Sequence, residues 1–276
     1  MKDRERVDVL LVKKGLFDSR EKAQRAVMAG MVYHGDQRVD KPGSKVESTL
    51  EFNIKGNLLP YVGRGGLKLE KALKVFQLDL TEVLMLDIGA STGGFTDCAL
   101  QNGARKVYAL DVGYNQLAWK LRSDPRVVVM EKTNFRYCTL SDFKEGRPEF
   151  SSIDVSFISL KKILPALATI LQENGEVVAL IKPQFEAGRE EVGKKGIVHD
   201  PKVHLSVIQD LLQFALSCGF SILHLDYSPI TGGDGNIEFL THLRLDGDHA
   251  ENLLETTPEE VVRTAHNNFK KKQTND

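Results

Sequence analysis

The clearest clue to the architecture is a glycine-rich segment, Leu86-Asp87-Ile88-Gly89-Ala90-Ser91-Thr92-Gly93-Gly94-Phe95-Thr96. An apolar run over 83–87 predicts a buried strand that ends at Asp87, and a helix is expected over 95–101. Glycines in the turn between them allow the backbone to approach a ligand closely. Their spacing is not the G-x-G-x-x-G of dinucleotide-binding folds, and no Gly-Lys-Ser/Thr follows as in a P-loop. The segment therefore predicts a strand–turn–helix unit with a ligand-binding turn of another kind.

Beyond this turn, short apolar runs suited to buried parallel strands alternate with helical segments. The expected strands cover 106–111, 127–130, 152–157 and 176–181, and the expected helices cover 160–171 and 204–216. Two more strands, over 222–227 and 237–245, complete the predicted sheet. The pattern predicts a doubly wound, Rossmann-like α/β domain over 67–246. A C-terminal helix and a polar tail, containing Lys270-Lys271-Lys272, are expected over 247–276.

Composition limits the class of protein. The 276 residues contain 37 Lys and Arg against 38 Asp and Glu, so the net charge of −1 excludes a polycation that coats nucleic acid. Charges interrupt every apolar run before the ~20 residues of a membrane-spanning helix, and the N-terminus has no apolar secretion signal. Three scattered cysteines, Cys98, Cys138 and Cys218, predict neither disulfides nor a zinc site. We expect a cytoplasmic protein without a membrane or metal partner; no oligomeric state follows from the sequence.

The first 59 residues form a separate, more basic module. They hold 12 Lys and Arg against 9 Asp and Glu, whereas the rest of the chain holds 25 against 29. Apolar spacing predicts one helix over 6–17 and another over 18–28 that stops at Gly30, followed by strands over 31–33 and 46–54. The helical pair carries a set of basic residues, Arg6, Lys13, Lys14, Arg20, Lys22 and Arg25. They form either a solvated charged face or a binding surface.

This small α+β module resembles an S4 RNA-binding domain. The resemblance rests on the segments Arg6-Val7-Asp8-Val9-Leu10-Leu11-Val12 and Ser19-Arg20-Glu21-Lys22-Ala23-Gln24-Arg25-Ala26-Val27, and on the Gly30-Met31-Val32 turn. S4 domains use a basic helical face on structured RNA, so the resemblance implies that the six basic residues contact RNA phosphates. Glycines and a proline over 56–66 predict a linker, which we place at 60–66.

An acidic residue follows the glycine-rich turn at the distance that ribose recognition requires. Asp111 ends the next predicted strand, about 20 residues after the turn, where a carboxylate can bind two ribose hydroxyls. D-x-G-x-x-x-G-G-F followed by this acid resembles motif I of class I S-adenosylmethionine methyltransferases, so the resemblance implies that cofactor. The implied cofactor-binding residues are Asp87, Gly89, Ser91, Gly93, Gly94, Phe95, Asp111 and Asn134. Asn134 is equally consistent with a simple turn, in which asparagine is common.

Four more charged residues fall at strand ends or beside the predicted sheet: Lys68, Asp154, Lys182 and Glu238. Each taken alone could be a structural ion-pair residue, because a buried charge demands a partner. Together, their order resembles the catalytic tetrad of FtsJ-like ribose 2′-O-methyltransferases, and the S4 module narrows this to the TlyA, or hemolysin A–like, family. That family methylates ribose 2′-hydroxyls of ribosomal RNA, so ribosomal RNA or a ribosomal subunit is the implied partner. The resemblance implies Lys182 as base, Asp154 as its orienting group, and Lys68 and Glu238 as ribose-holding residues.

Two loops and two rival functions stay open at this stage. Residues 184–200 form either a solvated loop or a lid over the RNA nucleotide, and His199 within them is expected to be an ordinary loop histidine. Gly232-Gly233-Asp234-Gly235 forms either a flexible hairpin or a close approach to RNA. A non-catalytic RNA-binding protein with a vestigial methyltransferase fold would be distinguished by a cofactor titration. A pore-forming hemolysin would need amphipathic membrane segments or secretion signals, and neither is seen.

Overall fold

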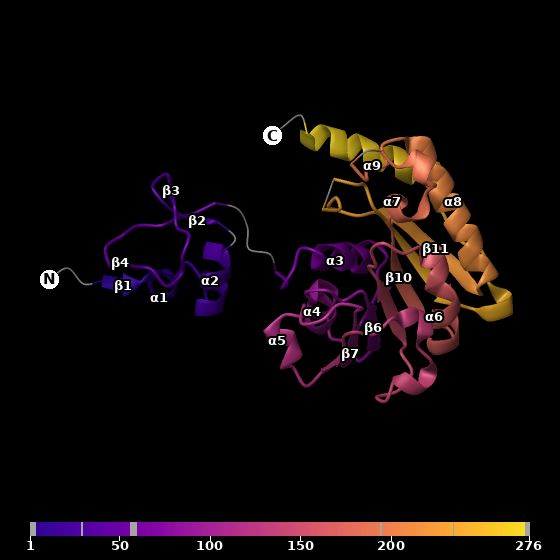
Figure 1. Ribbon diagram of the computed structural model, residues 1–276, viewed down its shortest axis with the longest axis horizontal. Coiled ribbons are helices and arrows are strands. Elements are labelled where there is room, and N and C mark those ends of the chain that lie inside the picture. The colour runs from indigo at the N-terminus through magenta and orange to yellow at the C-terminus, as the bar shows by residue number, and fades with distance from the viewer. Residues whose placement is uncertain (1–3, 29, 56–59, 194, 234, 274–276) are drawn as a thin grey trace. The chain divides into compact units, whose positions relative to one another are not determined.

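The computed structural model describes residues 4–28, 30–55, 60–193, 195–233 and 235–273. The chain divides into two compact units, Met1–Pro60 and Tyr61–Asp276 (Figure 1). Each unit has its own hydrophobic core. Among the described residues, no helix is both long enough and apolar enough to cross a membrane.

The first unit packs two short helices on small antiparallel sheets. The helices are α1 (Val7–Lys13) and α2 (Arg20–Met28). The strand β2 (Val32–His34) lies between β3 (Gln37–Arg38) and β5 (Asn53–Ile54), and β1 (Arg4–Arg6) pairs with β4 (Lys45–Glu47). Apolar residues at helical spacing, such as Leu11 and Val27, are buried between these elements. The helix expected over 6–17 is shorter, because the chain turns at Gly15, whose φ is +71°.

The second unit is built on a seven-stranded sheet in the order β11-β12-β10-β9-β6-β7-β8. Its strands are β6 (Leu84–Ile88), β7 (Lys106–Leu110), β8 (Val127–Met130), β9 (Phe150–Ile153), β10 (Glu176–Ile181), β11 (Phe220–Tyr227) and β12 (Phe239–Leu245). Five neighbouring strands, from β10 to the edge strand β8, are parallel, whereas β12 runs antiparallel to both β10 and β11. The carboxyl ends of the parallel strands therefore share one edge, where such folds place their sites.

Helices cover both faces of this sheet (Figure 1). The helices are α3 (Gly66–Val75), α4 (Gly94–Gln101), α5 (Trp119–Arg122), α6 (Leu164–Ile170), α7 (Pro183–Glu186), α8 (Pro201–Ser217) and α9 (Pro258–Gln273). Successive strand residues point to opposite faces, so Leu86 packs in the core under α6 and α8 while Met85 packs under α3 and α4. Both faces are apolar because both are covered. This confirms the predicted doubly wound α/β domain.

Four details differ from the sequence-based expectation. The strand expected over 152–157 ends at Ile153, so Asp154 and the residues after it form a loop. Helix α3 occupies a segment for which no helix was expected. Residues 61–66 of the linker expected at 60–66 belong to the second unit, and Tyr61 is 5% exposed in its core. Helix α9 has 16 residues, so it is longer than the short helix expected in the tail, and it includes Lys270.

Candidate active site

The glycine-rich turn joins β6 to α4 and lies directly against the loop that follows β9. Gly89 has φ +89°, and a Cβ built there would lie 2.6 Å from the backbone oxygen of Asp154. At Gly94, a Cβ would lie 2.8 Å from the backbone nitrogen of Gly66, at the start of α3. Glycine is required at both positions because backbone occupies the space of a side chain. The turn is thereby packed against the two segments that carry Lys68 and Asp154.

Asp87 lies beneath the turn rather than on its ligand side. The side chain is fully buried, and its two oxygens accept hydrogen bonds from Thr96 Oγ1 at 2.7 Å and Ser152 Oγ at 2.8 Å. Burial raises the pKa of Asp87 to about 6, although both hydroxyl groups act against this shift. Phe95 is also buried, in the core between the sheet and α4. These two predicted cofactor contacts are therefore better placed to support the turn than to touch a ligand.

Asp111 faces the open side of the turn, directly after β7. Its carboxylate accepts hydrogen bonds from the backbone N–H of Ser91 at 2.8 Å and of Gly113 at 2.7 Å. Each carboxylate oxygen can accept a further bond, so two ribose hydroxyls can still be held. The neighbouring Val112 is 70% exposed and offers an apolar surface to a flat ring. We call the glycine-rich turn over 89–94 together with Asp111 the cofactor cradle. This cradle and the apolar surface of Val112 fit the ribose and adenine of S-adenosylmethionine.

Asn134 has a local partner. It precedes a short 3₁₀ turn (Phe135–Tyr137), and its side-chain oxygen accepts a hydrogen bond from the backbone N–H of Arg136 at 3.2 Å. The backbone N–H of Thr133 in turn donates to the carbonyl of Asp111 at 3.0 Å. The segment therefore lies beside the acid, and Asn134 shapes the turn at this edge of the cradle.

The four residues of the predicted tetrad meet in one chain of contacts. Lys182 Nζ lies 2.6 Å from Asp154 Oδ1, Asp154 Oδ2 lies 3.3 Å from Lys68 Nζ, and Lys68 Nζ lies 2.6 Å from Glu238 Oε2. Lys182 Nζ also donates to Ser156 Oγ at 3.1 Å. The side chains are between 3% and 17% exposed. Charges therefore alternate along a nearly buried row, and each charge has an opposite neighbour.

The row is electrostatically coupled. Burial opposes the charge on Lys68, but Asp154 and Glu238 outweigh this effect and raise its pKa above the ordinary lysine value. Burial likewise opposes the charge on Asp154, but Lys68 and Lys182 outweigh it and lower the pKa of the carboxyl group. The carboxylate of Asp154 is therefore ionised at neutral pH and holds the side chains of Lys68 and Lys182 in place.

Different elements bring the tetrad together. Lys68 lies in the first turn of α3, Asp154 follows β9, Lys182 follows β10, and Glu238 precedes β12. The segment before α3 is fixed on α4, because the backbone N–H of Val62 donates to the buried Asp97 at 2.8 Å. The site therefore forms between the carboxyl ends of the parallel strands and the segment before α3, which is docked on α4.

Two aromatic residues beside Lys182 were not singled out from the sequence. Phe157 follows Asp154 by three positions, is 90% exposed and has φ +64°. Its ring centroid lies 5.1 Å from that of Phe185, and Lys182 Nζ lies 5.9 Å from the Phe185 ring. A bulky residue in the left-handed region with an exposed ring is costly, so it is a candidate for function. A long apolar side chain in a predicted strand gave no signal of this exposure.

In the first unit, a buried acid organises part of the basic face. Asp8 is 0% exposed and accepts hydrogen bonds from Arg6 at 2.9 and 3.0 Å, from Arg20 at 3.1 Å and from Gln24 at 2.7 Å. The Arg6 guanidinium holds the pKa of Asp8 well below its usual range. Arg6 and Arg20 are thus fixed side by side while about half of each side chain stays exposed.

Each of the three lysines in the predicted RNA-binding face pairs with an acidic residue. Lys13 pairs with Glu5, Lys14 Nζ lies 3.3 Å from Glu51, and Lys22 Nζ lies 2.6 Å from Asp18. Each acidic partner offsets part of the positive charge. Arg25 lies in the last turn of α2. The strongest candidates for phosphate contact are therefore the two arginines fixed by Asp8.

The loop over 184–200 is more ordered than a plain solvated loop. It begins in α7, and Glu186 accepts hydrogen bonds from Ser159 Oγ and from the backbone N–H of Leu160 at 2.7 Å. Burial raises the pKa of Glu186. Near its end, the backbone N–H of Val198 donates to Asn236 Oδ1 at 3.0 Å, which joins the loop to the segment before Glu238. His199 is exposed, and Lys194 and Asp234 lie outside the described residues.

Comparison with known proteins agrees with this arrangement. An S4 domain matches residues 5–51, and an FtsJ-like methyltransferase matches residues 61–245. The Bacillus subtilis protein YqxC is 60% identical over 274 residues, covering 98% of this chain and 97% of its own. The 16S/23S rRNA (cytidine-2'-O)-methyltransferase TlyA of Mycobacterium tuberculosis is 41% identical over 251 residues, covering 91% of this chain and 93% of its own.

A solved structure from Streptococcus thermophilus covers 99% of this chain and 100% of its own, with 56% identity and a TM-score of 0.79. The resemblances stated from the sequence are thereby confirmed at the level of family and fold. From its sequence, its two domains and its relatives, the chain belongs to the FtsJ-like methyltransferase family, with an S4 domain in front of the methyltransferase domain.

Proposed function

We propose that this chain methylates a ribose 2′-hydroxyl of ribosomal RNA with S-adenosylmethionine. The observation that carries the proposal is the contact row Lys182–Asp154–Lys68–Glu238, which lies against the cofactor cradle through Gly89 and Gly94. The name of the 41%-identical TlyA protein supplies the substrate class for that relative, and the matching architecture supports the same class here.

The residues fit the demands of methyl transfer to a ribose oxygen. The cofactor supplies an activated methyl group on a sulfonium, which leaves as a neutral thioether when the new carbon–oxygen bond forms. The protein's task is to align the hydroxyl and take up its proton. In this proposal Lys182 Nζ accepts the proton in its neutral form, Asp154 holds Lys182 in position, and Lys68 with Glu238 holds the ribose.

The exposed ring of Phe157 fits the same reaction. A ribose reaches a buried row of side chains more easily when its base is turned out of the RNA and stacked on an aromatic ring. Phe157 and Phe185 present such a surface beside Lys182. We therefore assign them to the base of the methylated nucleotide.

The test is incubation of the protein with methyl-labelled S-adenosylmethionine and separated ribosomal subunits. Label in the RNA of at least one subunit is expected, and calorimetry should show cofactor binding. Cofactor binding without transfer to any RNA would favour a binding protein with a vestigial site. Absence of both would contradict the assignment of the cradle.

A further inference from the structure

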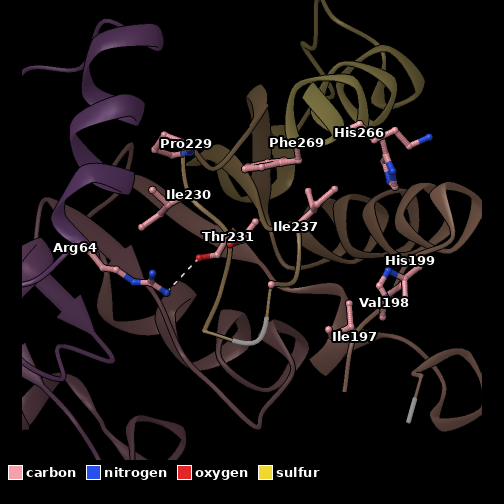
Figure 2. Close-up of a pocket in the computed structure, with 12 residues that line it drawn as sticks. Arg64, Ile197, Val198, His199, Pro229, Ile230, Thr231, Ile237, His266 and Phe269 are labelled. Carbon is pink, nitrogen blue, oxygen red and sulfur yellow. Dashed lines mark hydrogen bonds between the residues drawn. The ribbon is translucent and has the colours of Figure 1, made fainter. Parts of the chain in front are cut away.

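The second unit contains a pocket beside the tetrad that neither the cofactor cradle nor the tetrad uses. Its volume is about 590 Å³, within the range of sites that hold small molecules. Its walls come from four places: the segment before α3, the end of the loop over 184–200, the segment between β11 and β12, and helix α9 (Figure 2). Helix α9 follows the region matched by the methyltransferase family, which ends at residue 245.

The lining combines positive charge with apolar and aromatic surface. Among the described residues that line the pocket, Arg64 and Lys270 carry positive charge, and none carries a carboxylate. His199 and His266 add ring nitrogens that can form hydrogen bonds, and burial lowers the pKa of His266. Apolar contact comes from Ile230 and from Phe269, whose ring lies 6.1 Å from that of Tyr227. In Figure 2, Arg64 lies on one side of the pocket and the two histidines on the other, with Phe269 between them in the view. Cations around an aromatic ring suit a phosphate that is attached to a flat base.

Two of the pocket's walls are continuous with the tetrad. Arg64 precedes Lys68 by four residues, and the backbone N–H of Lys68 donates to the Gly65 carbonyl at 2.9 Å. On the opposite wall, Ile237 directly precedes Glu238. A Cβ at Gly232 would lie 2.7 Å from Glu238 Oε1, so the segment between β11 and β12 contacts the tetrad as well. An RNA strand whose ribose reaches Lys182 would therefore place a neighbouring nucleotide near this pocket.

We propose that the pocket is a second nucleotide subsite, which holds the nucleotide next to the methylated one in the RNA strand. This inference rests on the proposed function. Arg64 contacts the phosphate, and the base lies against Phe269 and Ile230. The guanidinium is already oriented toward the pocket, because Arg64 donates a long hydrogen bond of 3.5 Å to the carbonyl of Thr231. Helix α9 thereby adds RNA contacts to the catalytic unit.

The experiment compares single-turnover methylation by full-length variants across a range of ribosomal RNA concentrations. Arg64→Gln should raise the half-saturating RNA concentration about threefold to tenfold and reduce the salt slope by about one unit, as expected for one lost phosphate contact. Phe269→Leu should raise the half-saturating RNA concentration about tenfold, because the base loses the aromatic ring on which it stacks. The salt slope should stay unchanged, because the substitution removes no charge. Phe269→Tyr should stay within about twofold of the unsubstituted chain, since tyrosine keeps the aromatic face.

Lys144→Gln is the matched control, because it removes one exposed charge from the loop that leads into the amino end of β9, whereas the tetrad lies at the carboxyl ends of the parallel strands. Equal effects of Arg64→Gln and Lys144→Gln would show that only net charge matters and would overturn the proposal. Unchanged RNA concentrations for both Arg64→Gln and Phe269→Leu would also overturn it. S-adenosylmethionine titration and thermal unfolding identify a variant that has merely lost its fold. Failure of the proposed function appears separately, as absence of methyl transfer by the unsubstituted chain.

Discussion

Replacing Lys182 by alanine and by arginine distinguishes two roles of its side chain, the removal of a proton and the supply of positive charge. Its Nζ lies 2.6 Å from Asp154 Oδ1 and 3.1 Å from Ser156 Oγ, at the end of β10. Lys182→Ala removes this amine but leaves the Asp154–Lys68–Glu238 contacts in place. A general base contributes about 10² to 10⁴ in rate, so activity should fall below about one per cent. Cofactor affinity should stay nearly unchanged, because the lost interaction belongs to the transition state.

Lys182→Arg provides the decisive comparison. A guanidinium can still pair with Asp154, but it stays protonated and cannot accept a proton. Single-turnover rates at saturating RNA and cofactor exclude binding defects from the comparison. We expect the arginine variant to be as inactive as the alanine variant. A rate near that of the unsubstituted chain would refute the reasoning, and proton removal would then belong to Asp154, Glu238 or water.

Three further predictions concern acidic residues. Asp111→Ala should weaken S-adenosylmethionine binding by about 1–3 kcal/mol through the loss of charge-assisted hydrogen bonds, as calorimetry on the folded variant would show; unchanged affinity would remove Asp111 from the cradle. Because the pKa of Asp87 is raised to about 6, ionising it costs more in the folded state, so stability falls as pH rises from about 4 to about 6. Relative to Asp87→Asn, the native chain should lose about 1 kcal/mol between pH 5 and pH 7 in urea unfolding, and parallel pH profiles would contradict this. Asp8→Asn should release Arg6 and Arg20 and weaken RNA binding, measured by filter binding, at least as much as Arg20→Ala does; equal binding by the native chain and Asp8→Asn would contradict it.

The sequence predicted the ligand site best where a glycine needed for the backbone conformation and an acidic residue both follow predicted strands. Gly89 and Asp111 mark the ends of two adjacent parallel strands, so their spacing predicts a shared ligand site without any knowledge of packing. Asp154 and Lys182 follow the parallel strands β9 and β10, and Glu238 precedes the antiparallel strand β12, so all three lie at the same end of the sheet, whereas Lys68 lies on α3. Their mutual distances depend on how the segment before α3 docks on α4, which no local pattern specifies.

The misjudged segments have physical causes. Gly63-Arg64-Gly65-Gly66 has the composition of a linker, because glycine disfavours helices. Helix α3 begins at the last of these residues, Gly66, because Leu69 and Ala72 are completely buried in the core, and this gain outweighs the low helix propensity of glycine. Asp8 carries a detectable signal, since an acid inside an apolar helix needs a buried partner.

The chemical position of the transferred methyl group tests the central claim most directly. Ribosomal RNA labelled by the native chain would be hydrolysed in alkali and its products separated. A methyl group on the 2′-oxygen blocks attack on the adjacent phosphate, so the account predicts label in alkali-resistant dinucleotides and none with Lys182→Ala. Label recovered in single nucleotides methylated on the base would contradict the account.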